Sequence, residues 1–148
     1  MLPMALPRRL TPMPTGKRHN GKVPRILIAD DATDSREMYE EYLSFEGFEV
    51  DTAADGRQAL AKAVAARPDV LVLDLTMPGV DGWDVATSLK ADPRTRDVRI
   101  IAVTGHALTG SEAAARKAGV DAFLSKPYLP EDLAAEIKVQ LRRTPRPT

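Results

Sequence analysis

Short apolar runs alternate with longer amphipathic stretches along the middle of the chain. Five runs rich in aliphatic residues predict strands at 25–29, 48–53, 69–75, 99–104 and 122–125. The third and fourth runs, DVLVLDL and RIIAVT, are nearly continuous in Val, Leu and Ile, which is typical of central strands buried on both faces of a parallel sheet. This alternation of strands with helix-sized segments predicts an α/β fold with helices packed on a parallel sheet.

The segments after the five strands contain start and stop signals for five helices. Thr33 or Asp34 can cap the first helix, which would stop at Gly47. The other helices are expected to start at Asp55-Gly56, Gly82, Ser111 and Pro130. Five strands and five helices therefore fit between residues 24 and 141.

Composition changes at both ends of the chain. Four of the 12 prolines fall in the first 14 residues and two in the last four, and these ends carry eight Lys and Arg and no acid. The sequence therefore predicts flexible basic tails at 1–23 and 142–148 around one domain at 24–141. That domain has 13 basic and 21 acidic residues, a net charge of −8, which disfavours binding to nucleic acid.

Length and residue usage exclude several classes of protein. With 148 residues we expect one domain and no separate output domain. The absence of cysteine excludes disulfides, thiolate metal sites and a cysteine nucleophile. No apolar run is long enough to span a membrane, and the proline-broken start does not read as a secretory signal, so we expect a cytoplasmic protein.

Polar residues with a shared chemistry follow the predicted strands. In order along the chain they are Asp30-Asp31, Asp74, Thr104 and Lys126. Ligands of open parallel sheets bind at the carboxyl ends of the strands, so these side chains are expected to meet there. Three clustered carboxylates call for a cation, and an all-oxygen set suits Mg²⁺. With an ammonium and a hydroxyl beside it, Asp74 could accept a phosphoryl group and become an aspartyl phosphate.

Four motifs in this order resemble the response-regulator receiver domain of two-component signalling. They are Asp30-Asp31 after the first strand, Asp74 in LVLDLTMPGVDG, Thr104 in AVTGHA, and Lys126-Pro127 in AFLSKP. The resemblance covers about residues 25–141. It implies a flavodoxin-like, doubly wound, five-stranded parallel sheet of order 2-1-3-4-5 with five helices.

The resemblance also implies a role for each site residue. Asp74 would be the phosphoacceptor, and the phosphodonor would be a phosphohistidine on a sensor histidine kinase or a phosphotransfer protein. Mg²⁺ would be bound by Asp31, Asp74 and the backbone carbonyl of Thr76, with Asp30 acting through a bound water. Thr104 and Lys126 would hold the phosphoryl group, and the Lys126-Pro127 bond would be cis.

Further positions bear on signalling and rate. The resemblance implies that Phe123 changes rotamer when Thr104 moves, which alters the face made by the fourth helix, the last strand and the last helix. Thr76 and His106 flank the path of the water that removes the phosphoryl group, so both are candidate modulators of its lifetime. Tyr128 is expected to anchor the last loop.

Three functions remain in competition. The first is a single-domain receiver that catalyses only its own phosphorylation and dephosphorylation and acts through an unknown downstream protein. The second is a degenerate receiver used as a scaffold, which would lack a site residue, although none is missing here. The third is a phosphohydrolase of the haloacid-dehalogenase type, which is disfavoured because Thr76 stands where such enzymes carry a second aspartate. A flavin site is excluded because Asp30-Asp31 would repel the flavin phosphate.

Overall fold

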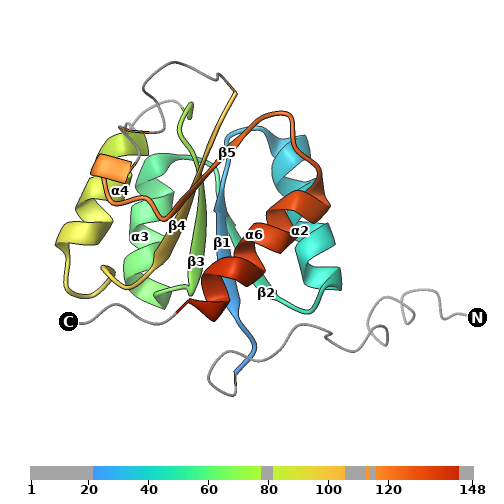
Figure 1. The fold of residues 1–148 in the computed structure, drawn as a ribbon, viewed down its shortest axis with the longest axis horizontal. Coiled ribbons are helices and arrows are strands. Elements are labelled where there is room, and N and C mark those ends of the chain that lie inside the picture. Colours follow the sequence, from blue (N-terminus) through green and yellow to red (C-terminus); the bar gives the residue numbers. More distant parts are fainter. Residues whose placement is uncertain (1–21, 78–81, 106–112, 114–115, 144–148) are drawn as a thin grey trace, which may run out of the picture.

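The computed structural model describes residues 22–77, 82–105, 113 and 116–143. Its elements are β1 (Arg25–Ala29), α2 (Thr33–Phe45), β2 (Glu49–Ala53), α3 (Gly56–Ala66), β3 (Val70–Asp74), α4 (Gly82–Ala91), β4 (Arg99–Thr104), β5 (Ala122–Ser125) and α6 (Pro130–Arg142). All strand pairs are parallel, in the order β2-β1-β3-β4-β5 (Figure 1). The predicted α/β fold and strand order are confirmed. The predicted helix starting at Ser111 lies mostly outside the described residues.

Helices cover both faces of the sheet and enclose two apolar cores. Helices α3 and α4 lie on one face, and α2 and α6 lie on the other (Figure 1). Successive strand residues alternate between the cores, so Leu27 and Leu71 pack on the α3–α4 side while Ile26 and Val70 pack on the α2–α6 side. Strands β3 and β4 are buried along their whole length, as predicted for central strands. Among the described helices, none is both long and apolar enough to cross a membrane.

The start of α2 differs from its sequence-based prediction. Neither Thr33 nor Asp34 caps this helix, because Ala32 precedes it and makes no side-chain cap bond. The N–H of Ala32 instead donates to Asp30 Oδ1 at 2.8 Å. The side chain of the residue that follows β1 therefore stabilises the turn into α2. Helix α3 starts at Gly56 as predicted, and the Asp55 side chain before it accepts from the N–H of Gln58.

A buried ionic cluster ties α4, β4 and the segment before β5 together. The Asp121 side chain is fully buried and accepts from the N–H of Ile100 at 2.8 Å. Lys90 Nζ lies 3.3 Å from Asp121 Oδ2 and also donates to the Val98 carbonyl, while Arg99 Nη1 lies 3.6 Å from Asp121 Oδ1. The side chains of Lys90 and Arg99 are 13% and 8% exposed, so their charges have little access to solvent. This cluster fixes where β5 begins.

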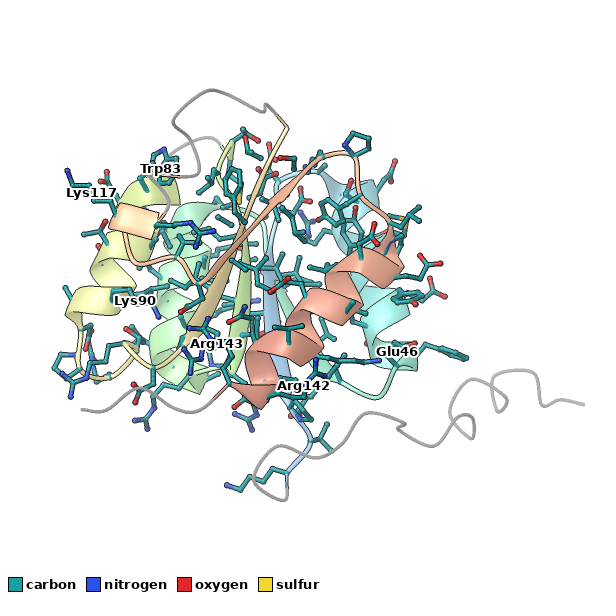
Figure 2. The ribbon with its side chains drawn as sticks, in the orientation of Figure 1. Glu46, Trp83, Lys90, Lys117, Arg142 and Arg143 are labelled. Carbon is teal, nitrogen blue, oxygen red and sulfur yellow. The ribbon has the colours of Figure 1, made fainter. Side chains whose placement is uncertain are left out.

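The other face of the sheet has an ion pair between its two helices. Lys138 of α6 donates to Glu46, directly after α2, with Nζ 2.9 Å from Oε1. Figure 2 shows Glu46 and Lys90 on opposite sides of the sheet. Ion pairs therefore reinforce the packing on both faces.

Strand β2 forms one edge of the described sheet, and side chains occupy hydrogen-bonding groups of its backbone. The Glu49 N–H donates to the Pro24 carbonyl, and the Ala53 carbonyl accepts from the Asp30 N–H, so these two β2 residues hydrogen-bond toward β1. Because backbone groups of successive strand residues point to opposite sides, the N–H and carbonyl of Thr52 point away from β1, toward the open edge. The Thr52 N–H donates to Asp51 Oδ1 at 2.8 Å, and the Thr52 carbonyl accepts from Lys62 Nζ at 2.5 Å. The outward groups of Thr52 are thus already paired within the chain.

Candidate functional site

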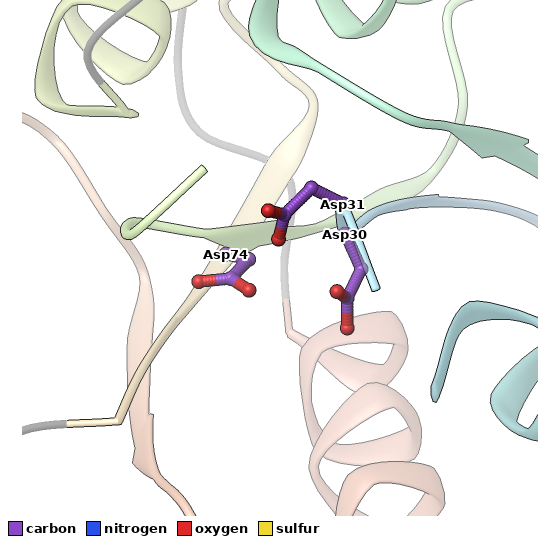
Figure 3. A group of neighbouring side chains, drawn as sticks. All are labelled: Asp30, Asp31 and Asp74. Atoms are coloured by element: carbon purple, nitrogen blue, oxygen red, sulfur yellow. The ribbon is translucent and has the colours of Figure 1, made fainter. Parts of the chain in front are cut away.

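Three carboxylates meet at the carboxyl ends of β1 and β3. Asp30 and Asp31 follow β1, and Asp74 is the last residue of β3. Since β1 and β3 are parallel neighbours, their ends bring one oxygen of each carboxylate to within 4.8 Å of the others (Figure 3). Asp30 and Asp74 are buried, whereas Asp31 is exposed. The structure therefore brings together the three acids that the sequence placed at this edge.

The Asp30 carboxylate is held in the turn between β1 and α2. Its Oδ1 accepts from the Ala32 N–H, and its own N–H donates to the Ala53 carbonyl at 3.0 Å. Burial raises the pKa of Asp30, and the charges of Asp74 and Asp31 act in the same direction, while the Ala32 N–H and Lys126 act against it. A nearby cation would therefore lower the free-energy cost of keeping the buried Asp30 carboxylate ionised.

The two oxygens of the Asp74 carboxylate have different partners. Oδ1 accepts from both the N–H of Thr76 at 2.9 Å and the hydroxyl of Thr76 at 2.7 Å. Oδ2 accepts from Lys126 Nζ at 3.2 Å. The resemblance implied that the Thr76 carbonyl would bind Mg²⁺ and that Thr76 could affect the lifetime of the phosphoryl group. It did not indicate that the Thr76 hydroxyl would donate to the Asp74 carboxylate.

Lys126 reaches the acids from the end of β5. Its N–H donates to the Thr104 carbonyl at 2.8 Å, and its Nζ lies 4.0 Å from Asp30 Oδ2 as well as close to Asp74. Burial alone would lower the pKa of Lys126, but the carboxylates of Asp74 and Asp30 outweigh it and hold that pKa above its ordinary value. The ammonium is therefore charged at neutral pH and faces the carboxylates. The Lys126-Pro127 bond is cis, as predicted.

The remaining predicted residues lie on the neighbouring strands where the structure describes them. Thr104 is buried at the end of β4, and its register partner on β5 is Ser125. Phe123 is partly buried on β5 and packs against the core on the α3–α4 side. His106, the other candidate rate modulator, lies outside the described residues.

The residues present at this edge fit a hard divalent cation. The donor set is three carboxylates, all oxygen, in one small space. Burial, with a smaller contribution from the charges of Asp74 and Asp31, raises the pKa of Asp30, and a cation would favour its ionised form. Asp30, Asp31 and Asp74 could therefore hold a metal ion, with Lys126 beside them.

Replacing Asp30 is expected to increase the stability of the metal-free protein and to weaken its binding of divalent cations. Because the folded-state pKa of Asp30 is raised, the protein should gain stability as the pH falls from above that raised pKa toward the ordinary value. Asp30→Asn removes the charge and keeps an acceptor for Ala32, so without divalent cations it should unfold at higher urea than the wild type at pH 7. The difference should shrink near pH 4, and the variant should bind divalent cations more weakly.

Urea unfolding in EDTA at both pH values and calorimetric titration with Mg²⁺ check this prediction. An Asn variant that is less stable than the wild type at pH 7 would contradict it.

Some contacts around the site carry no signal in the sequence. Arg36 of α2 donates from Nη1 to the Asp30 carbonyl at 2.7 Å, which steadies the turn that presents the acids. Tyr39 of α2 stacks on Tyr128, which lies in the loop between β5 and α6. An arginine and a tyrosine on a helix are ordinary surface and core residues, so the sequence pattern alone could not single them out.

Comparisons with known proteins agree with this geometry. A sequence model described as the response regulator receiver domain matches residues 26–138. The transcriptional regulatory protein PrrA of Mycobacterium leprae (strain TN) is 40% identical over 120 residues, which are 81% of this chain and 51% of that protein. The chain therefore spans about half the length of the curated relatives it matches.

Two solved structures are similar over most of this chain. A CheY-like response regulator receiver domain protein from Methanospirillum hungatei JF-1 is 32% identical with a TM-score of 0.76, covering 81% of this chain and 94% of that one. The receiver domain of sensor histidine kinase PA1611 from Pseudomonas aeruginosa PAO1, which has a magnesium ion coordinated in its active site cleft, is 29% identical with a TM-score of 0.75 and covers 82% and 99%. The acidic cluster lies at the predicted strand ends, and the family model matches most of the chain. The chain therefore belongs to the response regulator receiver domain family.

Proposed function

We propose that this receiver domain takes a phosphoryl group onto Asp74 in a Mg²⁺-dependent reaction. The observation that carries the proposal is the position of the Asp74 carboxylate, which lies within 4.8 Å of the acidic pair and 3.2 Å from the Lys126 ammonium. The donor is a phosphohistidine on a sensor histidine kinase or a phosphotransfer protein. This assignment rests on family membership together with the donor set of the site.

The residues divide the work of phosphoryl transfer. An oxygen of Asp74 attacks phosphorus, the new O–P bond forms, and the P–N bond to the donor imidazole breaks. Lys126 and Thr104 bind oxygens of the transferred group, so the protein contributes mainly position and charge. Water later cleaves the O–P bond, and Thr76 and His106 are the positions proposed to affect that rate.

Asp31, Asp74 and the backbone carbonyl of Thr76 would hold the metal, and Asp30 would act through a bound water. When bound, Mg²⁺ neutralises charge on the phosphoryl oxygens and lets the crowded carboxylates stay ionised. The raised pKa of Asp30 and the all-oxygen donor set support this part of the proposal.

The output is a change in a protein-binding face. Bonds from Thr104 to the phosphoryl group favour one packing of Phe123, which alters the surface formed by the predicted fourth helix, β5 and α6. A downstream protein reads this surface. The acidic composition of residues 24–141 favours a protein over nucleic acid as the direct partner.

Intact mass spectrometry tests the chemistry. We expect incubation with acetyl phosphate and Mg²⁺ to add one labile phosphoryl group to the wild type. The group should be absent with EDTA and in Asp74→Asn, whose amide is a poor nucleophile. Beryllofluoride with Mg²⁺ provides a second probe, because it mimics the phosphoryl group without a donor. A protein that responds to neither probe would contradict the proposal and favour the scaffold function, whereas release of phosphate over many turnovers would favour a phosphohydrolase.

A further inference from the structure

The loop from Lys126 to Leu129 connects β5 to α6 and carries the ammonium of the site. Its backbone is held at both ends: the Lys126 N–H donates to the Thr104 carbonyl, and the Leu129 N–H donates to Asp132 Oδ2 at 3.0 Å. Within this loop, Pro127 and Leu129 are exposed, whereas Tyr128 is partly buried. The Tyr128 side chain is therefore the part of the loop that packs on the body of the domain.

Tyr128 packs on Tyr39, which belongs to a different part of the site. The two rings are stacked, with centroids 5.3 Å apart and an interplanar angle of 15°. Tyr39 is buried in α2, the helix that starts directly after the acidic pair. The stack thus joins the loop that carries Lys126 to the helix that follows Asp30 and Asp31.

Tyr128 lies near the charged groups of the site. Burial, with the Tyr39 side chain beside it, raises the pKa of Tyr128 well above its usual value, and the carboxylates of Asp30 and Asp74 add to the shift. The Tyr128 ring therefore lies close to the carboxylates of the site.

We propose that Tyr128 and Tyr39 are positioning residues for Lys126: their stack holds the lysine loop against α2, so that Nζ stays 3.2 Å from Asp74 Oδ2 and 4.0 Å from Asp30 Oδ2. This inference rests on the proposed function, in which Lys126 binds the phosphoryl group. It predicts a selective effect. The acids are held by other contacts, Ala32 with Asp30 and Thr76 with Asp74, so metal binding does not depend on the stack.

Variants at the two positions separate positioning from simple packing. Tyr128→Leu removes the stacked ring and keeps an apolar side chain, whereas Tyr128→Phe keeps the ring. With saturating Mg²⁺, Tyr128→Leu and Tyr39→Leu should each bind beryllofluoride about three- to tenfold more weakly, the range expected for loss of an aromatic pair. Tyr128→Phe should bind as the wild type does, and Mg²⁺ affinity measured by calorimetry should stay unchanged in all three.

Two matched controls and a double-mutant cycle complete the binding experiment. Phe45→Leu changes an exposed aromatic residue of the same helix, and Leu129→Ala changes an exposed residue of the same loop, so both should leave beryllofluoride affinity unchanged. The combined Tyr39→Leu and Tyr128→Leu variant should lose no more affinity than either single variant, because each already breaks the stack. In a Lys126→Ala background, Tyr128→Leu should have no further effect.

A ligand-free measurement keeps this inference separate from the proposed function. In ¹⁵N relaxation experiments without Mg²⁺, the amides of Lys126 and Tyr128 should become more mobile in Tyr128→Leu and remain ordered in Tyr128→Phe. If the wild type binds no beryllofluoride, the proposed function fails, and the relaxation result alone decides whether the stack orders the loop. Unchanged mobility, an equal loss of Mg²⁺ affinity, or an undiminished effect in the Lys126→Ala background would overturn the proposal.

Discussion

Asp121→Ala should lower the free energy of unfolding by about 3–5 kcal/mol, as expected when one partner of a buried ion pair is removed. The Asp121 side chain is fully buried and lies near three cations: Lys90 and Arg99, which are mostly buried, and Arg143, which is more exposed. Removing the carboxylate leaves the two buried cations with a large desolvation cost and also takes away the acceptor for the Ile100 N–H. Urea unfolding followed by circular dichroism measures the loss.

An exposed ion pair of almost the same length provides the control. Arg25 Nε lies 3.2 Å from Glu49 Oε1, close to the 3.3 Å between Lys90 and Asp121, but both of its side chains are more than half exposed. Glu49→Ala should therefore change stability by no more than about 0.5 kcal/mol. Asp121→Asn keeps an acceptor oxygen and should fall between the two. Similar losses for Asp121→Ala and Glu49→Ala would refute the role given to burial.

Lys126→Ala is expected to slow phosphorylation of Asp74 by acetyl phosphate about a hundredfold, a loss typical of removing one group that stabilises transition-state charge. The ammonium lies 3.2 Å from Asp74 Oδ2, so it is in place to bind an oxygen of the incoming phosphoryl group. Rates are measured by intact mass at saturating Mg²⁺, which keeps metal occupancy equal in both proteins.

The matched control for this variant is another paired lysine with similar exposure. Lys138 lies 2.9 Å from Glu46 and its side chain is 37% exposed, against 30% for Lys126, but it bridges α2 and α6 away from the acids. Lys138→Ala should phosphorylate at the wild-type rate. If both lysine variants were slowed equally, the effect would reflect general loss of charge and not the position of Lys126.

The fold was predictable because its pattern is repeated and local. The runs at 25–29, 99–104 and 122–125 match β1, β4 and β5 residue for residue, since each is a mainly apolar segment with clear ends. The two other strands were predicted slightly too long: Phe48 precedes β2, and β3 ends at Asp74. Phe48 is buried in the α2–α6 core without being part of the strand, so apolar character alone marked it wrongly.

The acids and the lysine of the site could be located because strand ends concentrate functional groups in this architecture. The contacts that orient those groups could not be predicted. The Thr76 hydroxyl bonds Asp74 across a turn, Arg36 reaches back to a carbonyl, and Tyr39 meets Tyr128 from the far end of the chain. Each of these contacts depends on a side-chain rotamer or on packing between distant segments, and such features produce no periodic pattern in the sequence.

The paired backbone of Thr52 bears on how this domain avoids self-association. An open sheet edge grows by offering free N–H and carbonyl groups to a strand from another molecule, which is the first step toward fibrils. At Thr52 such a strand would have to displace Asp51 from the N–H and Lys62 from the carbonyl, and then bury both charges. The β2 edge therefore resists strand addition at Thr52.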